Sequence, residues 1–310
     1  MTFDRRSVIA GAAALAGSAC VPLDQSREGR LAAKFRILER DLGGRLGVAF
    51  FDPNERATID YRGGERFPMA STFKTSLGAL ALSLEQEGRL DLSERVRWSK
   101  DDLIAHTPFT GQRLQEGATL RELARTAQVT SDNLAANIVL ERVGGPDALT
   151  AFWRRLGDDT SRLDRMEPDL NFVPPGEERD TTTPAAMAQT LARMTASGID
   201  WPLVPEREAE LRRWMGESVT GLDRVRAGLP DEWVAGDKTG NSGSWGGAMG
   251  FLRGDIGFIE SPAGTPVFFA AYHQSAVGEP VDGERVDRLF AEIGRTLTAW
   301  TRRLYTIVLT

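Results

Sequence analysis

A serine and a lysine spaced three residues apart could form the reactive centre of a hydrolase. Ser71-Thr72-Phe73-Lys74 stands where a helical pattern begins, so both side chains would share one helix face. A hydroxyl group is a weak nucleophile until a nearby base or cation activates it, and the lysine amine would lie within reach. The positive end of the helix dipole would also favour a developing alkoxide. Alone, however, Ser-x-x-Lys is common on solvated helix faces.

A second polar cluster, Ser131-Asp132-Asn133, opens another helical pattern about sixty residues later. Ser, Asp and Asn are the preferred N-cap residues of helices, so a purely structural role would explain them. In an active site, Ser131 could instead pass a proton to a leaving nitrogen, and Asn133 could bind a substrate amide. The two motifs in this order are much less expected by chance than either one alone.

A third motif, Lys238-Thr239-Gly240, ends a stretch with strand character and runs into a Gly-rich turn. Taken singly, it is an ordinary strand end. Beside a substrate cleft, Lys238 and Thr239 could bind a carboxylate, and Gly240 would let a ligand backbone approach closely.

The fourth feature is a glutamate in a long irregular segment. Residues 157–180 have no clear period and contain Arg165-Met166-Glu167-Pro168-Asp169-Leu170-Asn171. A long irregular segment inside a compact domain is usually functional. Taken alone, Glu167 would be explained as a solvated loop carboxylate.

The elements that must position these residues follow a clear order. Hydrophobic periodicity and turn residues predict one helix followed by strands, then a long run of helices, and finally strands followed by a last helix. This order predicts an α+β fold, in which an antiparallel sheet flanked by helices is assembled from both chain ends, residues 30–64 and 217–305. Residues 65–216 would form an all-helical domain between them. The helices are expected at 31–41, 72–87, 120–128, 132–143, 146–156, 183–197 and 281–301, and the strands at 45–51, 58–61, 233–238, 251–259 and 266–274.

Together the four motifs resemble those of class A serine β-lactamases, within the penicillin-recognising serine enzymes. The first three are shared with penicillin-binding proteins, whereas Glu167 followed by Leu-Asn resembles the class A omega-loop signature. Asp180 matches the acidic residue that closes this loop, residues 165–180, against an arginine, here Arg165. The resemblance extends over about residues 31–302 and implies a β-lactamase/transpeptidase-like fold.

The resemblance implies hydrolysis of the β-lactam ring of antibiotics through a serine acyl-enzyme, and hence antibiotic resistance. Ser71 would be acylated, with Lys74, or Glu167 through a bridging water, as the base. Ser131 would deliver a proton to the leaving nitrogen. Glu167 would then drive deacylation with a water that the Asn171 amide holds. The implied catalytic residues are therefore Ser71, Lys74, Ser131 and Glu167.

The same resemblance implies further roles around the cleft. The backbone N–H groups of Ser71 and Asn241 would form the oxyanion hole, and Asn137 would brace the omega loop. An arginine usually binds the substrate carboxylate from one of two positions, and both are filled here, by Arg224 and Arg253, of which we favour Arg224. The residues expected to contact substrate are Asn133, Asn171, Lys238, Thr239, Gly240, Asn241, Arg224 or Arg253, and His106, which occupies a cleft-wall position that is often Tyr or Trp.

Two other functions remain open at this point. A penicillin-binding DD-peptidase of cell-wall synthesis would share three motifs and form the same acyl-enzyme, but it lacks a dedicated deacylating glutamate. A non-catalytic β-lactam sensor could keep the scaffold, but it would have no use for Glu167.

The composition limits the classes of molecule that this protein is expected to bind. The net charge is −6 with no basic stripe, which argues against nucleic acid. Two histidines and one cysteine supply few zinc ligands, so we expect hydrolysis without metal or cofactor. We expect a monomer that binds a small-molecule β-lactam and needs no obligate protein partner.

Residues 1–20 are predicted to be a signal peptide. Arg5-Arg6 precedes an uncharged run, residues 7–19, that is too short to span a bilayer. The arginine pair resembles a twin-arginine export signal, with a Sec signal as the alternative. Cys20 would tie the protein to a membrane only if it carried a lipid. The expected location is the periplasm or the exterior.

Overall fold

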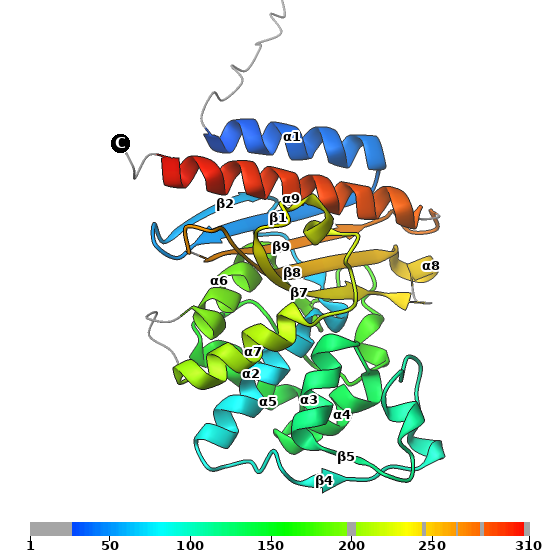
Figure 1. The fold of residues 1–310 in the computed structure, drawn as a ribbon. Helices are drawn as coiled ribbons and strands as arrows, with labels where there is room; N and C mark the ends of the chain where they lie inside the picture. Colours follow the sequence, from blue (N-terminus) through cyan, green and yellow to red (C-terminus); the bar gives the residue numbers. More distant parts are fainter. Residues whose placement is uncertain (1–26, 197–202, 244–245, 265, 280–281, 307–310) are drawn as a thin grey trace, which may run out of the picture.

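The computed structural model describes residues 27–306 apart from 197–202, 244–245, 265 and 280–281, and the predicted signal peptide with Cys20 lies outside this part (Figure 1). The described residues form a five-stranded antiparallel sheet in the order β2-β1-β9-β8-β7. Two strands come from the first part of the chain and three from the last, so the predicted α+β class and the sheet built from both chain ends are confirmed. The strands are β1 (Arg45–Asp52), β2 (Ala57–Tyr61), β7 (Val234–Asn241), β8 (Leu252–Glu260) and β9 (Pro266–Gln274).

Helices α1 (Arg27–Leu42) and α9 (Gly283–Thr306) cover one face of the sheet (Figure 1). The apolar residues of α1 recur on one side, and Phe35 is fully buried there. Its ring meets the ring of Phe50 edge-on at 6.0 Å, and Phe50 in turn lies 5.9 Å from Trp300 of α9. Aromatic contacts therefore join the two ends of the chain through the sheet.

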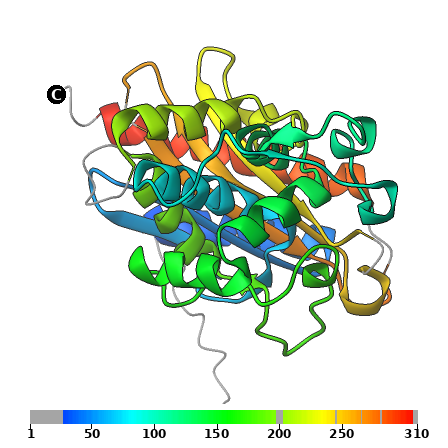
Figure 2. The same cartoon turned by 90° about the horizontal axis from the view of Figure 1, so that it is seen from below.

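Helices α2 to α7 lie under the opposite face of the sheet, and the short α8 lies at its end beside β8 (Figures 1 and 2). The central one, α2, is buried along most of its length, because neighbouring helices and the sheet surround it. Sheet residues Ile256 and Tyr272 belong to the same core cluster as the helical residues, so this core is continuous across the predicted boundaries. The division into residues 30–64, 65–216 and 217–305 stays a proposal. The helices are α2 (Phe73–Gln86), α3 (Leu120–Val129), α4 (Asn133–Arg142), α5 (Gly145–Arg155), α6 (Pro184–Thr195), α7 (Pro205–Gly216) and α8 (Gly246–Met249).

Several short elements complete the fold. Two-stranded pairs link β3 (Phe67–Pro68) to β6 (Thr181–Thr182) and β4 (Arg95–Val96) to β5 (Ala118–Thr119). The 3₁₀ turns are η1 (Ala70–Thr72), η2 (Lys100–Asp102), η3 (Thr110–Gln112), η4 (Asp169–Asn171) and η5 (Val225–Gly228). The pair β3–β6 matters most for the site, because it fixes the end of the irregular segment beside the turn that carries Ser71.

Helix α7 was not predicted from the sequence. Its run PEREAELRRWMG is mostly charged, so a period of apolar residues is hard to detect. The helix forms because Pro205 begins it and because Leu211, Trp214 and Met215 are buried against α2 and β7. Gly236 permits this approach, since a Cβ there would lie 2.8 Å from the Cβ of Met215. Packing against α2 and β7, and not a local sequence pattern, therefore makes this segment helical.

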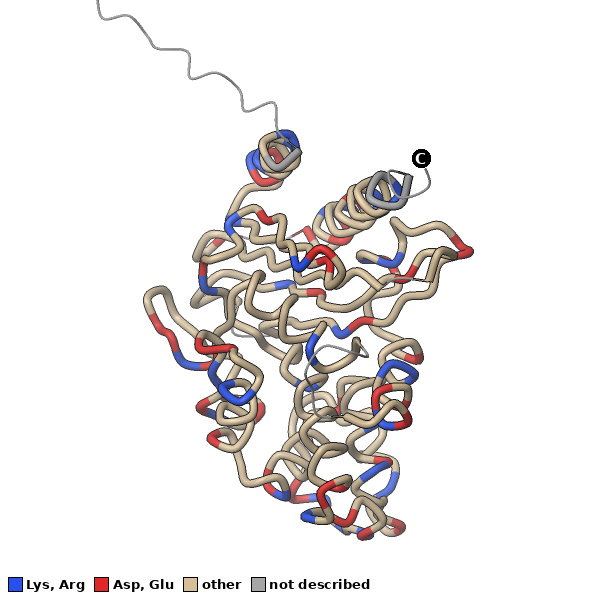
Figure 3. Tube along the Cα trace, turned by 90° about the vertical axis from the view of Figure 1, so that its left-hand side faces the viewer, with Lys and Arg blue, Asp and Glu red and all other residues tan. Residues whose placement is uncertain are grey.

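No helix in the described part of the chain is both long and apolar enough to cross a membrane. Basic and acidic residues are interspersed along the described trace (Figure 3). This mixed distribution agrees with the absence of a basic stripe from the sequence.

Removing the Trp214 side chain tests the packing of α7. Trp214→Ala leaves a large void between α7 and α2, and we expect the free energy of unfolding to fall by about 3–5 kcal/mol. Arg213→Ala, at an exposed position of the same helix, should change it by less than about 0.5 kcal/mol. Urea denaturation followed by circular dichroism measures both. Equal losses for the two variants would contradict the packing described.

Candidate active site

Ser71 lies in the 3₁₀ turn η1, directly before α2, as expected for a nucleophile at a helix start. The preceding residue, Ala70, has a left-handed backbone with φ of 43°, which is uncommon without glycine and is typical of constrained functional turns. Strand β7 passes close to this turn, because a Cβ on Gly240 would lie 2.9 Å from the carbonyl oxygen of Met69. Gly240 therefore permits strand and turn to pack together, and it does not line the cavity described below, which differs from its expected contact with a ligand.

Lys74 is fully buried and makes the predicted contact with Ser71. Its Nζ donates to Ser71 Oγ at 2.9 Å, to Asn133 Oδ1 at 2.5 Å and to the carbonyl oxygen of Ser131 at 2.9 Å. It also pairs with Glu167 Oε1 at 3.0 Å. Burial lowers the pKa of Lys74, and the charge of Glu167 opposes this shift. The ammonium is thus easier to deprotonate than an exposed lysine.

Ser131 joins the two buried lysines. Its Oγ accepts from Lys238 Nζ at 3.0 Å and from Lys74 Nζ at 3.4 Å. Burial, with a further contribution from the charge of Lys74, holds the pKa of Lys238 well below its usual value. Asp132 has the structural role that the motif also suggested, since its carboxylate caps α4 at the Ala135 N–H. The tripeptide therefore both caps a helix, through Asp132, and places polar side chains beside Lys74, through Ser131 and Asn133.

Glu167 is held on its loop by two amide side chains. Asn137 Oδ1 accepts from the Glu167 N–H at 2.9 Å, and Asn137 Nδ2 donates to the Glu167 carbonyl oxygen at 2.8 Å. Asn171, in η4, donates to Glu167 Oε2 at 2.6 Å. The other carboxylate oxygen accepts from Ser71 Oγ at 3.3 Å. The carboxylate is thus aimed at the nucleophile.

The loop is closed at its base by Arg165 and Asp180. Arg165 Nε donates to Asp180 Oδ2 at 2.5 Å, and Asp180 Oδ1 accepts from the backbone N–H groups of Asp164 and Arg165 at 2.7 and 3.0 Å. Asp180 is fully buried. Its carbonyl oxygen accepts from the Met69 N–H at 3.0 Å, which ties the loop to the turn that carries Ser71.

These side chains surround one cavity of about 380 Å³. Of the predicted residues, its lining includes Ser71, Ser131, Glu167, Asn133, Asn171, Thr239, Asn241, Arg224 and His106. The sequence analysis missed Ala105, Pro168, Thr220, Gly221, Ser242 and Gly243, which also line it. Thr220 Oγ1 accepts from Thr239 Oγ1 at 2.9 Å, yet no motif joins the two residues, so only the fold brings them together.

The two candidate arginines lie in different places. Arg224 lines the cavity, donates to the Gly254 carbonyl oxygen at 2.7 Å and is only 4% exposed. Arg253 is paired with Asn241 across the sheet and does not line the cavity, but both arginines lie 3.3 Å from the same atom, Asp287 Oδ1 of α9. The choice of Arg224 over Arg253 as the carboxylate contact stays a prediction.

His106 lies at the cavity wall and is exposed. Its φ is 60°, its Nε2 lies 3.0 Å from the Thr130 carbonyl oxygen, and its own carbonyl oxygen accepts from the Asn133 N–H. Among the described residues, no group of three or more His, Cys, Asp or Glu side chains is arranged to hold a metal ion. The geometry so far is that of a serine acyl-transfer site.

Comparisons with known proteins identify the family. The sequence profile of the family described as "Beta-lactamase enzyme family" matches residues 30–301. Beta-lactamase FAR-1 of Nocardia farcinica is 43% identical over 77% of this chain and 73% of its own, and beta-lactamase AST-1 of Nocardia asteroides is 38% identical over 95% of each. The solved structure of a class A beta-lactamase, the last common ancestor of Gram-negative bacteria, superposes with a TM-score of 0.81 at 41% identity, over 87% of this chain and 99% of that one. The chain belongs to the β-lactamase enzyme family and, within it, to class A, as its motifs predicted.

Substitution of Asp180 tests the closure of the loop. Asp180→Asn keeps the volume but removes the charge that Arg165 and two backbone N–H groups share, so we expect a loss of about 1–3 kcal/mol in the free energy of unfolding. We also expect faster proteolysis within residues 165–180. Glu177→Gln, which removes an exposed pair with Arg179 in the same loop, is the control and should leave both measurements unchanged. An Asp180 variant as resistant as the parent would show that the pair does not hold the loop.

Proposed function

We propose that this protein hydrolyses the β-lactam ring of β-lactam antibiotics through an acyl-enzyme on Ser71, and so confers antibiotic resistance. The observation that carries the proposal is the position of the Glu167 carboxylate, 3.3 Å from Ser71 Oγ and 3.0 Å from Lys74 Nζ. A serine with only a lysine beside it can be acylated, but a second base is needed to release the acyl group. The names of the similar proteins agree with this activity.

In acylation, Ser71 Oγ attacks the lactam carbonyl carbon and loses its proton. Two bases are in contact with the hydroxyl, Lys74 Nζ at 2.9 Å and Glu167 Oε1 at 3.3 Å, and either can take the proton. The backbone N–H groups of Ser71 and Asn241 stabilise the oxyanion. The ring C–N bond then breaks, and Ser131 Oγ gives its proton to the nitrogen. Lys74 and Lys238, both hydrogen-bonded to Ser131, replace that proton.

In deacylation, a water molecule attacks the ester carbonyl carbon. Glu167 takes a proton from this water, and the leaving Ser71 Oγ receives that proton, from Glu167 directly or by way of Lys74. Asn171 supports this step, because its Oδ1 is buried and accepts no hydrogen bond from any residue in the described part of the chain. That oxygen is free to accept from the water, while Nδ2 orients Glu167.

Cationic and hydroxyl groups line the part of the cavity across from Glu167. We propose that they bind the carboxylate that β-lactam antibiotics carry. Thr239 and Arg224 both line the cavity, and the buried Lys238 lies directly behind them. We propose that Thr239 Oγ1, which donates to Thr220 Oγ1 here, turns its hydrogen to the carboxylate when substrate binds, and that Arg224 and Lys238 supply the positive potential. Asn133, next to Lys74, binds the substrate amide, and His106 forms the outer wall. Because the substrate is small, the protein acts as a monomer in this proposal.

We further propose that the protein is exported and acts in the periplasm or outside the cell. The support comes from the sequence alone, from Arg5-Arg6 and the uncharged run over residues 7–19. Lipidation of Cys20 would add a membrane anchor.

Substitution of Glu167 tests the function. With Glu167→Ala, the acyl group should form on Ser71 and persist, because the deacylating base is gone, and nitrocefin turnover should fall by about 10²–10⁴-fold. Mass spectrometry of the intact protein detects the adduct. Glu178→Ala, in the same loop, is the control and should turn over nitrocefin as the parent does. A parent protein that gives only one stoichiometric burst would be a DD-peptidase or a sensor, and hydrolysis that survives Glu167→Ala would remove Glu167 from the mechanism.

Paired arginine variants test the carboxylate site. Arg224→Ala should lower kcat/KM for a penicillin about ten- to hundredfold, because an ionic contact of about 1.5–3 kcal/mol is lost, whereas Arg253→Ala should stay within about twofold. Arg224 also contacts Gly254, so the same rates are measured with the methyl ester of the substrate. The ester should be insensitive to Arg224→Ala. A larger effect of Arg253→Ala would reverse the assignment.

A further inference from the structure

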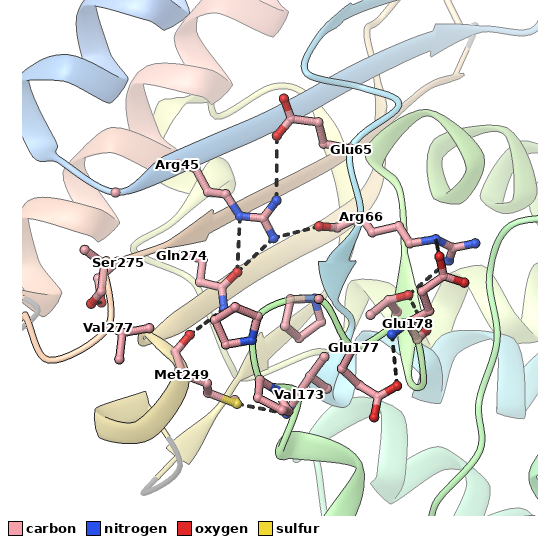
Figure 4. Close-up of a pocket in the computed structure, with 17 residues that line it drawn as sticks. Arg45, Glu65, Arg66, Val173, Glu177, Glu178, Met249, Gln274, Ser275 and Val277 are labelled. Carbon is pink, nitrogen blue, oxygen red and sulfur yellow. Dashed lines mark hydrogen bonds and ion pairs between the residues drawn. The ribbon is translucent and has the colours of Figure 1, made fainter.

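A second cavity, of about 710 Å³, lies on the other side of the Glu167 loop (Figure 4). Loop residues 173–178 form one side of it, and the start of β1, the segment before β3, the end of α8 and the turn after β9 form the rest. We call it the rear cavity. It shares no lining residue with the active-site cavity, and its volume is typical of sites for small organic ligands.

Arg45 projects into the rear cavity with donor capacity to spare (Figure 4). Its Nη2 donates to the Arg66 carbonyl oxygen at 2.7 Å and to Gln274 Oε1 at 2.9 Å. Its Nη1 has only Glu65, at 3.6 Å, which is too far for a good hydrogen bond. Burial lowers the pKa of Arg45 despite Glu65, so the positive charge is incompletely compensated.

Two of the three carboxylates that line the cavity are engaged outside it. Glu65 receives a 2.7 Å bond from Arg62, and Glu177 accepts from Arg179 Nε at 2.8 Å. The third, Glu178, is largely exposed and lies 4.0 Å from Arg66 Nε, while Arg66 Nη1 donates to Thr160 and Thr181.

Apolar groups cover the wall opposite Arg45. They are contributed by Pro68, Val173, Pro174, Pro175, Met249 and Val277. An arginine whose Nη1 has hydrogens to spare, facing an apolar wall, suits a small molecule with a carboxylate at one end and an apolar body at the other. We propose that the rear cavity is a second binding site for a small amphipathic anion, whose carboxylate lies on Arg45 and whose apolar body packs on Val173–Pro175 and Val277.

Occupation of this site acts on the loop that carries Glu167. The Val173 N–H donates to Met249 Sδ at 2.9 Å, and both residues line the rear cavity. Val173 lies only two residues after Asn171, which holds the Glu167 carboxylate. A ligand that bridges Arg45 and the loop therefore restrains residues 172–178. Binding itself does not depend on the proposed hydrolysis.

The test uses 4-phenylbutyrate as the probe and the whole chain as the protein. We expect saturable one-to-one binding by isothermal titration calorimetry, and no such binding of 4-phenylbutylamine, which has the same body with a cationic end. At a probe concentration ten times its Kd, hydrogen exchange in residues 172–178 should slow about tenfold, because bound protein does not open.

Two variants and a control locate the probe. Val277→Trp fills the rear cavity from an exposed position and should weaken binding at least tenfold, as should Arg45→Gln, which removes the charge. Val234→Trp, at a similarly exposed valine that begins β7 and does not line the rear cavity, should bind as the parent does. Val277→Trp keeps the test valid even if Arg45→Gln fails to fold.

Four results would overturn the proposal. The first two are absence of saturable binding and unchanged affinity in Val277→Trp. The third is protection of residues 220–224 and 239–243 in place of 172–178, which would put the probe in the active-site cavity. The fourth is tighter binding of the amine than of the carboxylate. None of these results bears on nitrocefin turnover, so failure here and failure of the proposed function are distinguishable.

Discussion

The structure depends on a buried ion pair, between Lys74 and Glu167 at 3.0 Å. Two charges removed from water lose a large hydration free energy, which their mutual attraction offsets only when hydrogen bonds satisfy the remaining atoms. Asn133 accepts from the ammonium and Asn171 donates to the carboxylate. Removal of one partner from such a pair typically costs about 3–5 kcal/mol, because the other charge is left buried and alone. Helix α2, helix α4 and the Glu167 loop are thus held together by the same atoms that perform the chemistry.

Positive charge converges on the other side of the nucleophile. Lys238 and Arg224 are both almost fully buried, and two carboxylic acids of β7 and β8, Asp237 and Asp255, are buried near them. Burial raises the pKa of both acids, and Arg226, 2.9 Å from Asp237, opposes the shift of Asp237. Burial acts on the cations as well, because it lowers the pKa of Lys238 and Arg224, and Arg224 also lies 3.3 Å from Asp287. The potential that an anionic substrate meets is therefore set by buried acids and buried cations together.

The Glu167 loop contacts a different cavity on each of its two sides. Its front holds the carboxylate against Ser71, and its rear forms a wall of the larger cavity. The Arg165–Asp180 pair at the base and the two Asn137 bonds at the front hold the loop in place, and at the rear the Val173 N–H contacts Met249 and the Glu178 carbonyl oxygen accepts from Thr181. A ligand at the rear can act on the loop while the bonds at its front keep the catalytic geometry.

The sequence by itself determined the reactive groups and most of the elements. Residues three apart on a helix share a face, and Lys74 is hydrogen-bonded to Ser71 as predicted. The apolar patterns also located the five main strands and most helices. Only the tertiary structure decided which residues far apart in sequence share a cavity. It placed Arg224 but not Arg253 in the cavity lining, packed Gly240 against the turn that carries Ser71 and added Thr220, because each depends on how strands and turns approach one another. Helix α7 and the rear cavity also arise from packing between distant segments, and no local pattern encodes them.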